Sequence, residues 1–380
     1  MYRSSLKIKW VGKTCVSCSL LFMTFMLLSL PAFSAEGRTP VFLYGTNINQ
    51  PGKYILTRNL TLAAGGPAGV FINVSDVDLD LNGFTIDANN GGTGVVVNPF
   101  ADHVRIHNGI IGPMMAGGVS CALCVDVVGP NTQVTVENIK CFDFSSYGIK
   151  YTTVTDGAIR RTEIRDGDGP GISWGGSAAG AIENCAIQSV TTGIEFVNAT
   201  NGQIVDNQIS VTEADGISIK SSRGVLVSEN TVDSAGQYGI VLVTSFTVKL
   251  FDNVVTSSTS HGIYLNPGSS DNLILNNISA RNGKIGIPPF SDGLLIQGGR
   301  NLVDRNLLTG NSNYGLHFSG GASACRNTFG RNTARGNNGG VCPIGGGLTP
   351  PDSCDETSQA ICGIAQTNSS YGDNLIAPLQ

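Results

Sequence analysis

A pattern with a period of about 23 residues limits what this chain can fold into more than any other feature of the sequence. A glycine followed by an isoleucine recurs in steps of 22 or 23 residues, at Gly148, Gly171, Gly193, Gly216, Gly239 and Gly262. Between these glycines lies a second marker on a 23-residue lattice: Asn138, Asn184, Asn207, Asn230, Asn253 and Asn276, with Arg161 at the one position without asparagine. Two markers with one period predict a solenoid, in which each unit buries its apolar side chains by stacking on its neighbours.

The side chains within one repeat predict strands. In residues 216–239, apolar residues alternate with polar ones, as in the pairs Ile217 and Ile219, then Val225 and Val227. A period of two belongs to strands, and Val, Ile and Thr favour them. We expect glycine to supply the positive φ of tight corners, and stacked asparagines to bond local backbone there. The pattern therefore predicts a parallel β-helix.

The chain divides into four predicted segments. Residues 1–35 have the pattern of an export signal, because basic residues precede an apolar run at 16–30 and small residues follow near Ser34 and Ala35. The run is short for a membrane span. We expect a soluble mature protein without a membrane span, located in the periplasm, at the cell surface or outside the cell; an uncleaved N-terminal anchor is the alternative. N-terminal cap strands at 36–68, a β-helix at 69–340 and an irregular cysteine-containing tail at 341–380 follow.

Eight cysteines follow the predicted signal, and an even number in an exported protein predicts disulfides. Cys121 and Cys124 lack the second pair of ligands that a zinc site needs, so we expect no metal there. Cys141 and Cys185 lie two coils apart and out of register by two residues, which predicts unpaired core residues. The cysteines expected to pair are those of the C-terminal region, Cys325, Cys342, Cys354 and Cys362.

Composition limits the partners. Charged residues make up 13% of the chain and the net charge is -5 without a basic run, which excludes nucleic acid as the expected partner. Low charge with many Asn, Ser, Thr and Tyr residues suits a polysaccharide or a cell-surface glycan, and equally an inert solenoid surface. Asp76, Asp78 and Asp80 alternate on one strand, a spacing that suits Ca²⁺ and also suits a solvated strand face that discourages edge pairing. No other cofactor is expected.

Two segments, INQPGKYILTRNLTL at 48–62 and DVDLDLNGFTID at 76–87, add to the repeats. Together they resemble the right-handed parallel β-helix proteins of the pectate-lyase-like superfamily, in particular exported bacterial members with carbohydrate-binding and sugar-hydrolysis repeats. The resemblance implies an all-β, single-domain right-handed parallel β-helix of roughly eleven coils. It also implies a groove along one sheet, where lyases, hydrolases and epimerases of that superfamily bind sugar chains.

The catalytic motifs of that superfamily are mostly missing. Polygalacturonase-like hydrolases have Asn-Thr-Asp, Asp-Asp, Gly-His-Gly and Arg-Ile-Lys motifs, and only Ser260-His261-Gly262 comes near one of them. The Asp-Pro-His-Asp motif of mannuronan epimerases is absent, and no motif matches the Arg or Lys base of calcium pectate lyases. These departures disfavour a hydrolase or a calcium lyase.

The repeat itself gathers side chains suited to acid–base chemistry. The residue before each corner glycine falls on one position of successive coils, about 4.8 Å apart, and this column contains Asp215, Tyr238, His261, Asp292 and Tyr314. The position two residues after the glycine forms an outward column that contributes Glu195, Tyr264 and His317.

These columns predict a glycan site. We expect His261 to remove a proton from C5 of a sugar, Asp292 to orient its imidazole, and Tyr238 to exchange a proton with the glycosidic oxygen. Lys284, in an inserted segment, is the basic group expected to neutralise a uronate carboxylate. The residues expected to bind substrate are Asp215, Tyr264, Tyr314, His317, Glu195 and Lys284.

The expected function is to bind or process polysaccharide, by β-elimination or epimerisation of uronate-containing glycans if the protein is an enzyme. Whether it is an enzyme stays open at this stage. Hydrolysis is disfavoured because Asp215 and Asp292 lie three coils apart, roughly 14 Å, whereas glycosidase carboxylates are about 5–9.5 Å apart. The alternative is a non-catalytic structural or adhesion β-solenoid of the envelope or surface.

Overall fold

A computed structural model describes residues 37–61, 67–88, 91–113, 121–176, 178–283, 291–319, 327–335 and 337. The predicted export signal, the predicted tail, Lys284 and Cys325 lie outside the described residues. The described residues from Thr39 onward form one compact unit. Within the ranges given above, no helix has the length and apolar character that crossing a membrane requires.

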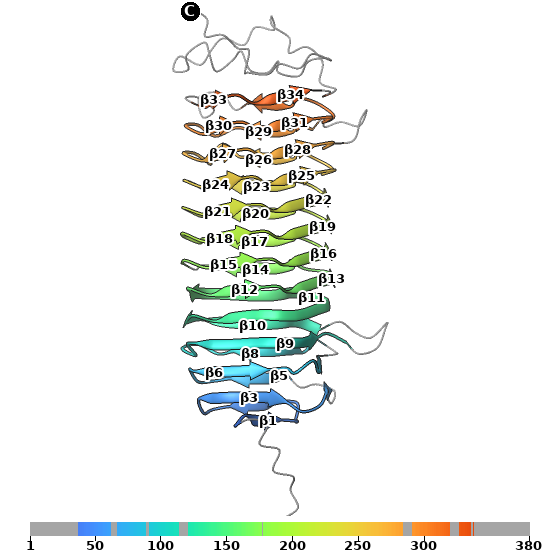
Figure 1. Ribbon diagram of the computed structural model, residues 1–380, viewed down its shortest axis with the longest axis vertical. Helices are drawn as coiled ribbons and strands as arrows, with labels where there is room; N and C mark the ends of the chain where they lie inside the picture. Colours follow the sequence, from blue (N-terminus) through green and yellow to red (C-terminus); the bar gives the residue numbers. More distant parts are fainter. Residues whose placement is uncertain are drawn as a thin grey trace, which may run out of the picture. The chain divides into compact units, whose positions relative to one another are not determined.

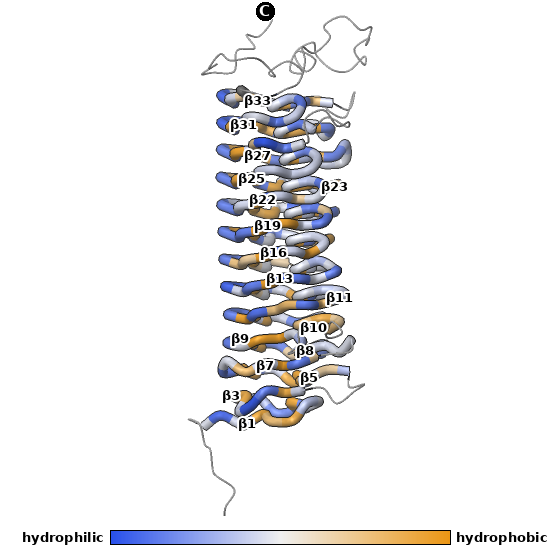
Figure 2. Tube along the Cα trace, turned by 90° about the vertical axis from the view of Figure 1, so that its right-hand side faces the viewer, coloured by the Kyte–Doolittle hydropathy of each residue, from blue (hydrophilic) through white to orange (hydrophobic). Residues whose placement is uncertain are grey.

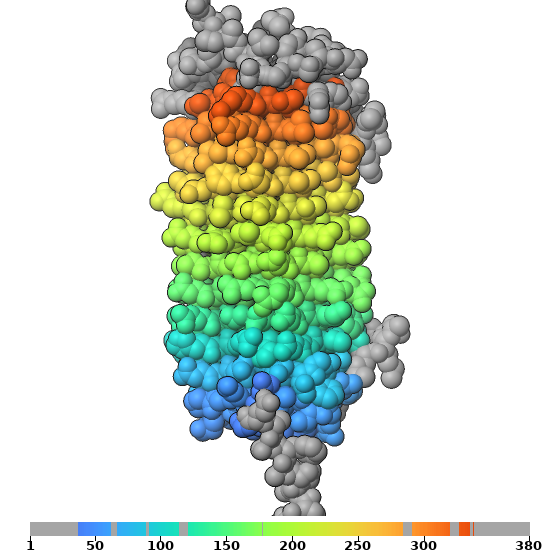
Figure 3. Space-filling model, in the orientation of Figure 1, coloured from blue at the N-terminus to red at the C-terminus, as the bar shows by residue number. Residues whose placement is uncertain are grey.

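The chain winds into a parallel β-helix of about eleven coils, which confirms the predicted fold class. Most coils contribute one strand to each of three sheets (Figure 1), while the long strands β9 and β11 run from one sheet into the next. Strands pair in parallel with the equivalent strands of the coils before and after. Figure 3 shows the coils as successive bands in sequence order, so residues one repeat apart in sequence are neighbours in space.

The first sheet carries the candidate site. It contains β2 (Thr46–Ile48), β5 (Ala68–Ile72), β8 (Thr93–Val97), β10 (Cys121–Thr132), the end of β11 (Thr135–Thr155), β14 (Ile172–Gly175), β17 (Ile194–Val197), β20 (Ile217–Lys220), β23 (Ile240–Val243), β26 (Ile263–Leu265), β29 (Leu294–Ile296) and β32 (Leu316–Phe318).

The other two sheets complete each coil. The second sheet contains β1 (Thr39–Val41), β3 (Gly52–Leu56), β6 (Val77–Asp80), the start of β9 (Val104–Ile111), the start of β11, β12 (Ala158–Arg160), β15 (Ala181–Glu183), β18 (Gln203–Val205), β21 (Leu226–Ser228), β24 (Lys249–Phe251), β27 (Leu273–Leu275), β30 (Leu302–Asp304) and β33 (Thr328–Gly330). The third contains β4 (Leu60–Thr61), β7 (Thr85–Asp87), the end of β9, the middle of β11, β13 (Glu163–Gly167), β16 (Ala186–Val190), β19 (Gln208–Thr212), β22 (Thr231–Ala235), β25 (Val254–Thr256), β28 (Ile278–Ala280), β31 (Leu307–Thr309) and β34 (Thr333–Arg335).

The core consists of columns of apolar side chains that point inward from the three sheets. Hydrophobic and hydrophilic residues alternate along the strands (Figure 2), as the period of two predicts. Ile217, Ile240 and Ile263 pair in register and are fully buried, which confirms the predicted interior column. Burying a side chain of this size contributes about 1.5–3 kcal/mol relative to leaving it exposed.

The corner glycines are required by close packing between coils. A Cβ on Gly216 would lie 2.3 Å from Val232 Cγ1 and 2.6 Å from the carbonyl oxygen of Gly239. The prediction that these glycines supply a positive φ is wrong, because Gly216, Gly239 and Gly262 do not have one. Positive φ values occur at other corner positions of these coils, for example at Asp206 (φ 55°) between the second and third sheets and at Gly224 (φ 67°) between the first and second.

Asparagines form a ladder at the corner between the second and third sheets. Asn207, Asn230 and Asn253 are buried, and each side-chain amide donates to a backbone carbonyl of the preceding coil, as predicted. The ladder continues through Asn277, Asn306 and Asn332.

Three of the asparagines on the predicted lattice lie one position too early. Asn138, Asn184 and Asn276 have φ values of 52°, 55° and 58°, so they occupy the left-handed position and not the ladder. The ladder position of the coil that contains Asn184 is filled by Cys185, whose N–H donates to Asn207. Repeats of 22 and 24 residues explain the error, because a strict period of 23 drifts from one column into the next.

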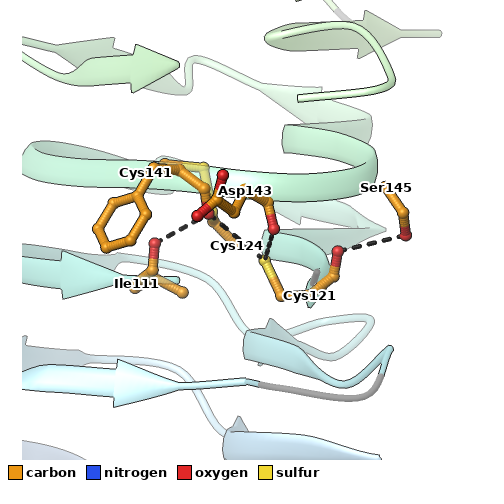
Figure 4. Close-up of a disulfide and its surroundings, with 7 residues drawn as sticks. Ile111, Cys121, Cys124, Cys141, Asp143 and Ser145 are labelled. Carbon is orange, nitrogen blue, oxygen red and sulfur yellow. Dashed lines mark hydrogen bonds between the residues drawn. A yellow bond between two sulfur atoms is a disulfide. The ribbon is translucent and has the colours of Figure 1, made fainter. Parts of the chain in front are cut away.

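A disulfide crosses the interior near the N-terminal end. Cys124 on β10 and Cys141 on β11 are bonded, with both side chains buried (Figure 4). The prediction that Cys141 is unpaired is wrong. The prediction considered only pairs of cysteines at equivalent positions of different coils. This bond instead joins two different sheets, the first and the third, across the interior. Cys185 is a buried free cysteine, as predicted.

Candidate functional site

The two predicted columns lie on consecutive coils of the first sheet. The N–H groups of Gly216, Gly239, Gly262 and Gly293 donate to the carbonyls of the next coil, at Tyr238, His261, Asp292 and Tyr314. This confirms the predicted order of the column that begins at Asp215. In the outward column, Tyr264 pairs with Leu295 and Leu295 pairs with His317.

The centre of the site is the carboxylate of Asp292, whose side chain is 2% exposed. Its Oδ2 atom lies 2.9 Å from Nδ1 of His317 and 3.5 Å from Nδ1 of His261. Its Oδ1 atom accepts hydrogen bonds from Nδ2 of Asn313 at 2.7 Å and from the N–H of Tyr314 at 3.0 Å. A buried carboxylate needs such donors, because an unpaired buried charge is costly.

The hydrogen bonds assign opposite tautomers to the two histidines. The backbone N–H of Asp292 donates to Nδ1 of His261 at 2.8 Å, so the proton of a neutral His261 ring resides on Nε2. In His317, Nδ1–H donates to Asp292 Oδ2, which leaves a lone pair on Nε2. Among the described residues, neither Nε2 atom has a hydrogen-bond partner. His261 thus presents a donor and His317 an acceptor.

Burial keeps His261 and Tyr264 in their neutral forms. Burial lowers the pKa of the His261 imidazole, Asp292 opposes this shift, and His317 adds to it. Burial, and then the neighbouring Tyr238, raise the pKa of the Tyr264 hydroxyl. That hydroxyl donates to Oε1 of Gln297 at 2.7 Å. The site therefore contains two neutral proton donors.

Aromatic rings form two groups beside Asp292. Tyr238 and His261 are stacked, with 5.9 Å between ring centroids and 4° between planes. The Tyr264 ring lies 4.9 Å from Tyr238 and 5.8 Å from His261. Tyr314 meets the His317 ring edge-on at 5.1 Å. Flat rings of this kind present large amphipathic contact surfaces.

A charged group lies on the preceding coils of the same sheet. Nζ of Lys220 lies 2.8 Å from Oε1 of Glu195. Asp215 accepts a hydrogen bond from the N–H of Tyr238 at 3.4 Å, and burial raises the pKa of its carboxyl group. The predicted residues thus separate into Glu195 and Asp215 on one side, and the residues around Asp292 on the other.

Sequence reasoning missed Lys220, Gln297 and Asn313. Lys220 and Gln297 occupy the outward position four residues after a corner glycine, Gly216 and Gly293. Outward-facing residues of a strand alternate, so the position two residues after Tyr264 and its equivalents in other coils also faces outward. Applying this alternation to the sequence finds the column of Lys220 and Gln297. Nothing in the sequence pattern points to Asn313, which acts through its contact with Asp292.

The three aspartates considered for Ca²⁺ already have protein partners. Asp76 lies near His103, with 3.4 Å between Oδ1 and Nδ1. Asp78 lies 2.8 Å from Nε2 of His107, and Asp80 accepts from the N–H of Asn82 at 2.8 Å. Among the described residues, no group of three or more His, Cys, Asp or Glu side chains is arranged to hold a metal ion. Calcium binding at this strand stays a prediction.

Comparison with known proteins supports the fold. The family model of the right handed beta helix region matches residues 123–279 and 256–334. Two crystal structures of mutants of the periplasmic alginate epimerase AlgG are similar: one at 16% identity over 77% of each chain with a TM-score of 0.52, the other at 13% identity over 67% of this chain and 66% of that chain with a TM-score of 0.53.

The A-module of the Azotobacter vinelandii mannuronan C-5 epimerase AlgE4 matches at 14% identity over 78% of this chain and 86% of that chain, with a TM-score of 0.49. Comparison with curated proteins gives no match. At these identities the likeness to solved structures shows the fold alone.

Proposed function

The chain belongs to the right-handed β-helix family, and we propose that it binds and processes a uronate-containing polysaccharide on the outer face of the first sheet. The similar AlgG structures are those of an alginate epimerase, which agrees with this substrate class. The proposal rests chiefly on the side chains of this chain around Asp292.

The observation that carries the proposal is the pairing of Asp292 with Nδ1 of His317, at 2.9 Å. The carboxylate fixes the tautomer of the ring and stabilises the imidazolium that forms when Nε2 takes a proton. The side chain of His317 is 22% exposed, so the ring is accessible from the face of the sheet. We therefore assign the general base to His317 in place of His261.

The reaction begins at the sugar carbon next to the carboxylate. The C5–H bond breaks, its proton moves to His317 Nε2, and its electron pair delocalises into the carboxylate. In β-elimination that pair then forms the C4–C5 double bond, while the glycosidic oxygen leaves and takes a proton from a donor. In epimerisation C5 takes a proton back on the opposite side of the ring.

The two neutral donors complete this chemistry. Nε2–H of His261 donates to the substrate carboxylate, where negative charge develops. The other ring nitrogen, Nδ1, accepts the hydrogen bond from the backbone N–H of Asp292, which holds the ring in place. The hydroxyl of Tyr264 is protonated, and once it turns from Gln297 to the substrate it serves as the acid for the leaving oxygen or for C5. Tyr238, stacked on His261, supports the sugar ring.

A polymer lying along the sheet reaches the charged group on earlier coils. Lys220 is the cation that we assign to a second uronate carboxylate, in exchange for its contact with Glu195. This group lies on β17 and β20, several coils from β32. The spacing favours an extended substrate over a single sugar.

The test is a screen of the protein on alginate, pectate and glycosaminoglycans. Elimination is detected by the ultraviolet absorbance of the new double bond, and epimerisation by deuterium incorporation at C5 from heavy water. We expect one of these signals, and a loss of about 10²–10⁴-fold in His317→Gln with unchanged melting temperature. Thr231→Ala, an exposed change on the third sheet, serves as the control. Full activity of His317→Gln on the polymer would overturn the assignment.

A second candidate function is glycan binding without turnover, as in a structural or adhesion protein. The stacked Tyr238 and His261 rings favour it, because such surfaces bind sugar rings without acid–base chemistry. Retention on an affinity gel that Tyr238→Ala weakens, with neither the ultraviolet nor the deuterium signal, would select this function.

We also propose that the protein acts outside the cytoplasm. The predicted export signal at residues 1–35 and the similarity to a periplasmic epimerase support this location. Mass spectrometry of the protein from a secretion-competent host should find an N-terminus shortly after Ser34 or Ala35. An intact Met1 in the exported fraction would contradict cleavage.

A further inference from the structure

We propose that the outer face of the second sheet is a second polysaccharide-binding site, which holds the polymer away from the acid–base residues. The inference rests on the proposed function in that both faces take the same polymer. Two neighbouring hollows lie on this face, with volumes of about 470 Å³ and about 420 Å³. The site around Asp292 lies on the first sheet, so the two faces share no side chains.

The two hollows lie one after the other along the sheet, because equivalent positions of successive coils line both, and we refer to them together as the trough. In the first hollow this column is Arg105, Thr135, Ala158 and Ala181, joined strand to strand. In the second it is Gln203, Leu226 and Lys249. Ala181 pairs directly with Gln203, so the column crosses from one hollow to the other without a missing strand. Seven strands at the usual spacing give a length of about 29 Å.

Small side chains form the floor of the trough at one end, and larger apolar side chains form it at the other. Gly157, Ala158, Ala179 and Ala181 line the first hollow, and side chains this small leave room for a flat ring over the strands. In the second hollow, Phe251 and Leu226 are partly exposed on the outer face. An aromatic ring beside an aliphatic side chain matches the apolar face of a pyranose.

Polar groups surround this floor at positions suited to hydroxyl groups. Asn201, Gln203, Glu229 and Asp252 line the second hollow, and Arg160 and Asp156 line the first. Amides, carboxylates and guanidinium groups each offer two adjacent donors or acceptors, as adjacent sugar hydroxyls require. A few placed polar groups around an apolar surface are typical of ligand sites.

The charges of the trough favour a glycan over nucleic acid. Nε of Arg105 donates to Glu137 at 2.6 Å, and Nε of Arg160 lies 2.8 Å from Glu183. Both guanidinium groups are therefore paired with carboxylates, whereas Lys249, which lines the second hollow, forms no ion pair with a described residue and is available to a uronate carboxylate. One such cation is not the basic stripe that binds phosphate backbones. A row of two hollows with a mixed polar edge fits an extended, hydroxyl-rich polymer.

Two linked binding faces raise the effective concentration of the polymer at the first sheet. The trough should therefore matter for long chains and not for short oligosaccharides. The test uses a Gln203→Ala/Phe251→Ala double variant, which removes one amide and one ring from the trough. Ile278→Ala, an outward and partly exposed position on the third sheet, is the matched control.

Retention on a gel containing the polymer is measured with both variants in a His317→Gln background, so that turnover does not interfere. We expect the double variant to lose at least about fivefold in affinity relative to the control, and to turn over short oligosaccharides at the wild-type rate when His317 is intact. A second variant, Ala181→Arg, fills the trough without removing a core group and should have the same effect at an unchanged melting temperature. Equal retention of all variants would overturn the trough.

The outcomes separate this inference from the proposed function. If turnover depends on His317 but the trough variants are retained on the gel as well as the control, the second site alone is refuted. Retention that depends on the trough, without any turnover, refutes the proposed reaction alone. Absence of both retention and turnover refutes both.

Discussion

The corner between the second and third sheets and the column on the first sheet use the same coil lattice in opposite ways. At the corner, successive coils from Asn207 onward carry the same residue, and each buried amide bonds to the next. On the first sheet consecutive coils carry different residues, from Asp215 through Tyr238 and His261 to Asp292. Repetition satisfies each polar group within the stack, whereas variation leaves the Nε2 atoms of His261 and His317 without a hydrogen-bond partner among the described residues. The first arrangement stabilises the solenoid, and the second provides chemistry.

The largest effect is expected from a change in the core beneath the first sheet. Ile240 is fully buried between Ile217 and Ile263. Ile240→Asp places an unpaired carboxyl group in this column, and it should lower the free energy of unfolding by several kcal/mol. Urea unfolding of the variant and wild type measures the difference. An unchanged unfolding midpoint would show that the register of the coils is different.

A change at the corner should reduce stability but not function. Asn230 accepts from the N–H and the amide of Asn207, and its own amide donates to Ile204, Ser228 and Asn253. Asn230→Ala leaves buried groups without partners, at a cost on the order of 1–3 kcal/mol for each. Activity per folded molecule should stay at the wild-type value.

The comparison at the site reverses this pattern. Tyr238→Ala removes an aromatic ring from the sheet face and should weaken glycan binding while changing the unfolding free energy less than Asn230→Ala does. Thermal unfolding and affinity gels on the two variants check this. If Asn230→Ala weakened binding and Tyr238→Ala cost more stability, the division between corner and column would be wrong.

The smallest expected effect is a pH dependence of stability from His261. Its pKa is lowered in the folded state, chiefly by burial, so the unfolded chain binds more protons once the pH falls below the ordinary value of about 6.5. The stability that neutral His261 provides is thus present above that pH and decreases below it. Unfolding free energies at pH 7.5 and 5.5 should fall more for wild type than for His261→Gln. Equal losses would contradict the shift.

The sequence predicted which side chains are neighbours, because in a parallel solenoid two residues separated in sequence by one repeat length are stacked on adjacent coils. That is why the order from Asp215 to Tyr314, and the interior isoleucines, were predictable. The same reasoning failed by one residue for Asn184 and Asn276, since repeats of 22 and 24 residues shift the register. A sequence period therefore identifies the residues of one column correctly only where the repeat length is constant.

The sequence period does not predict the direction in which each side chain points, either within a column or between columns. The bond between Cys124 and Cys141 joins different sheets across the interior, which no comparison of equivalent positions reveals. The pairing of Asp292 with His317 links the position before one glycine to the position two residues after the next. Whether His261 donates or accepts depends on one backbone N–H, and only coordinates show that contact.

The most direct test of the site is the tautomer of each histidine, read by ¹⁵N NMR of the folded protein at pH 7. The chain has only four histidines, so His317→Gln and His261→Gln suffice to assign both rings. The geometry around Asp292 predicts opposite tautomers: His261 neutral with its proton on Nε2, and His317 with its proton on Nδ1. Identical tautomers, or a protonated His261 at this pH, would contradict the assignment of His317 as the base and His261 as the donor.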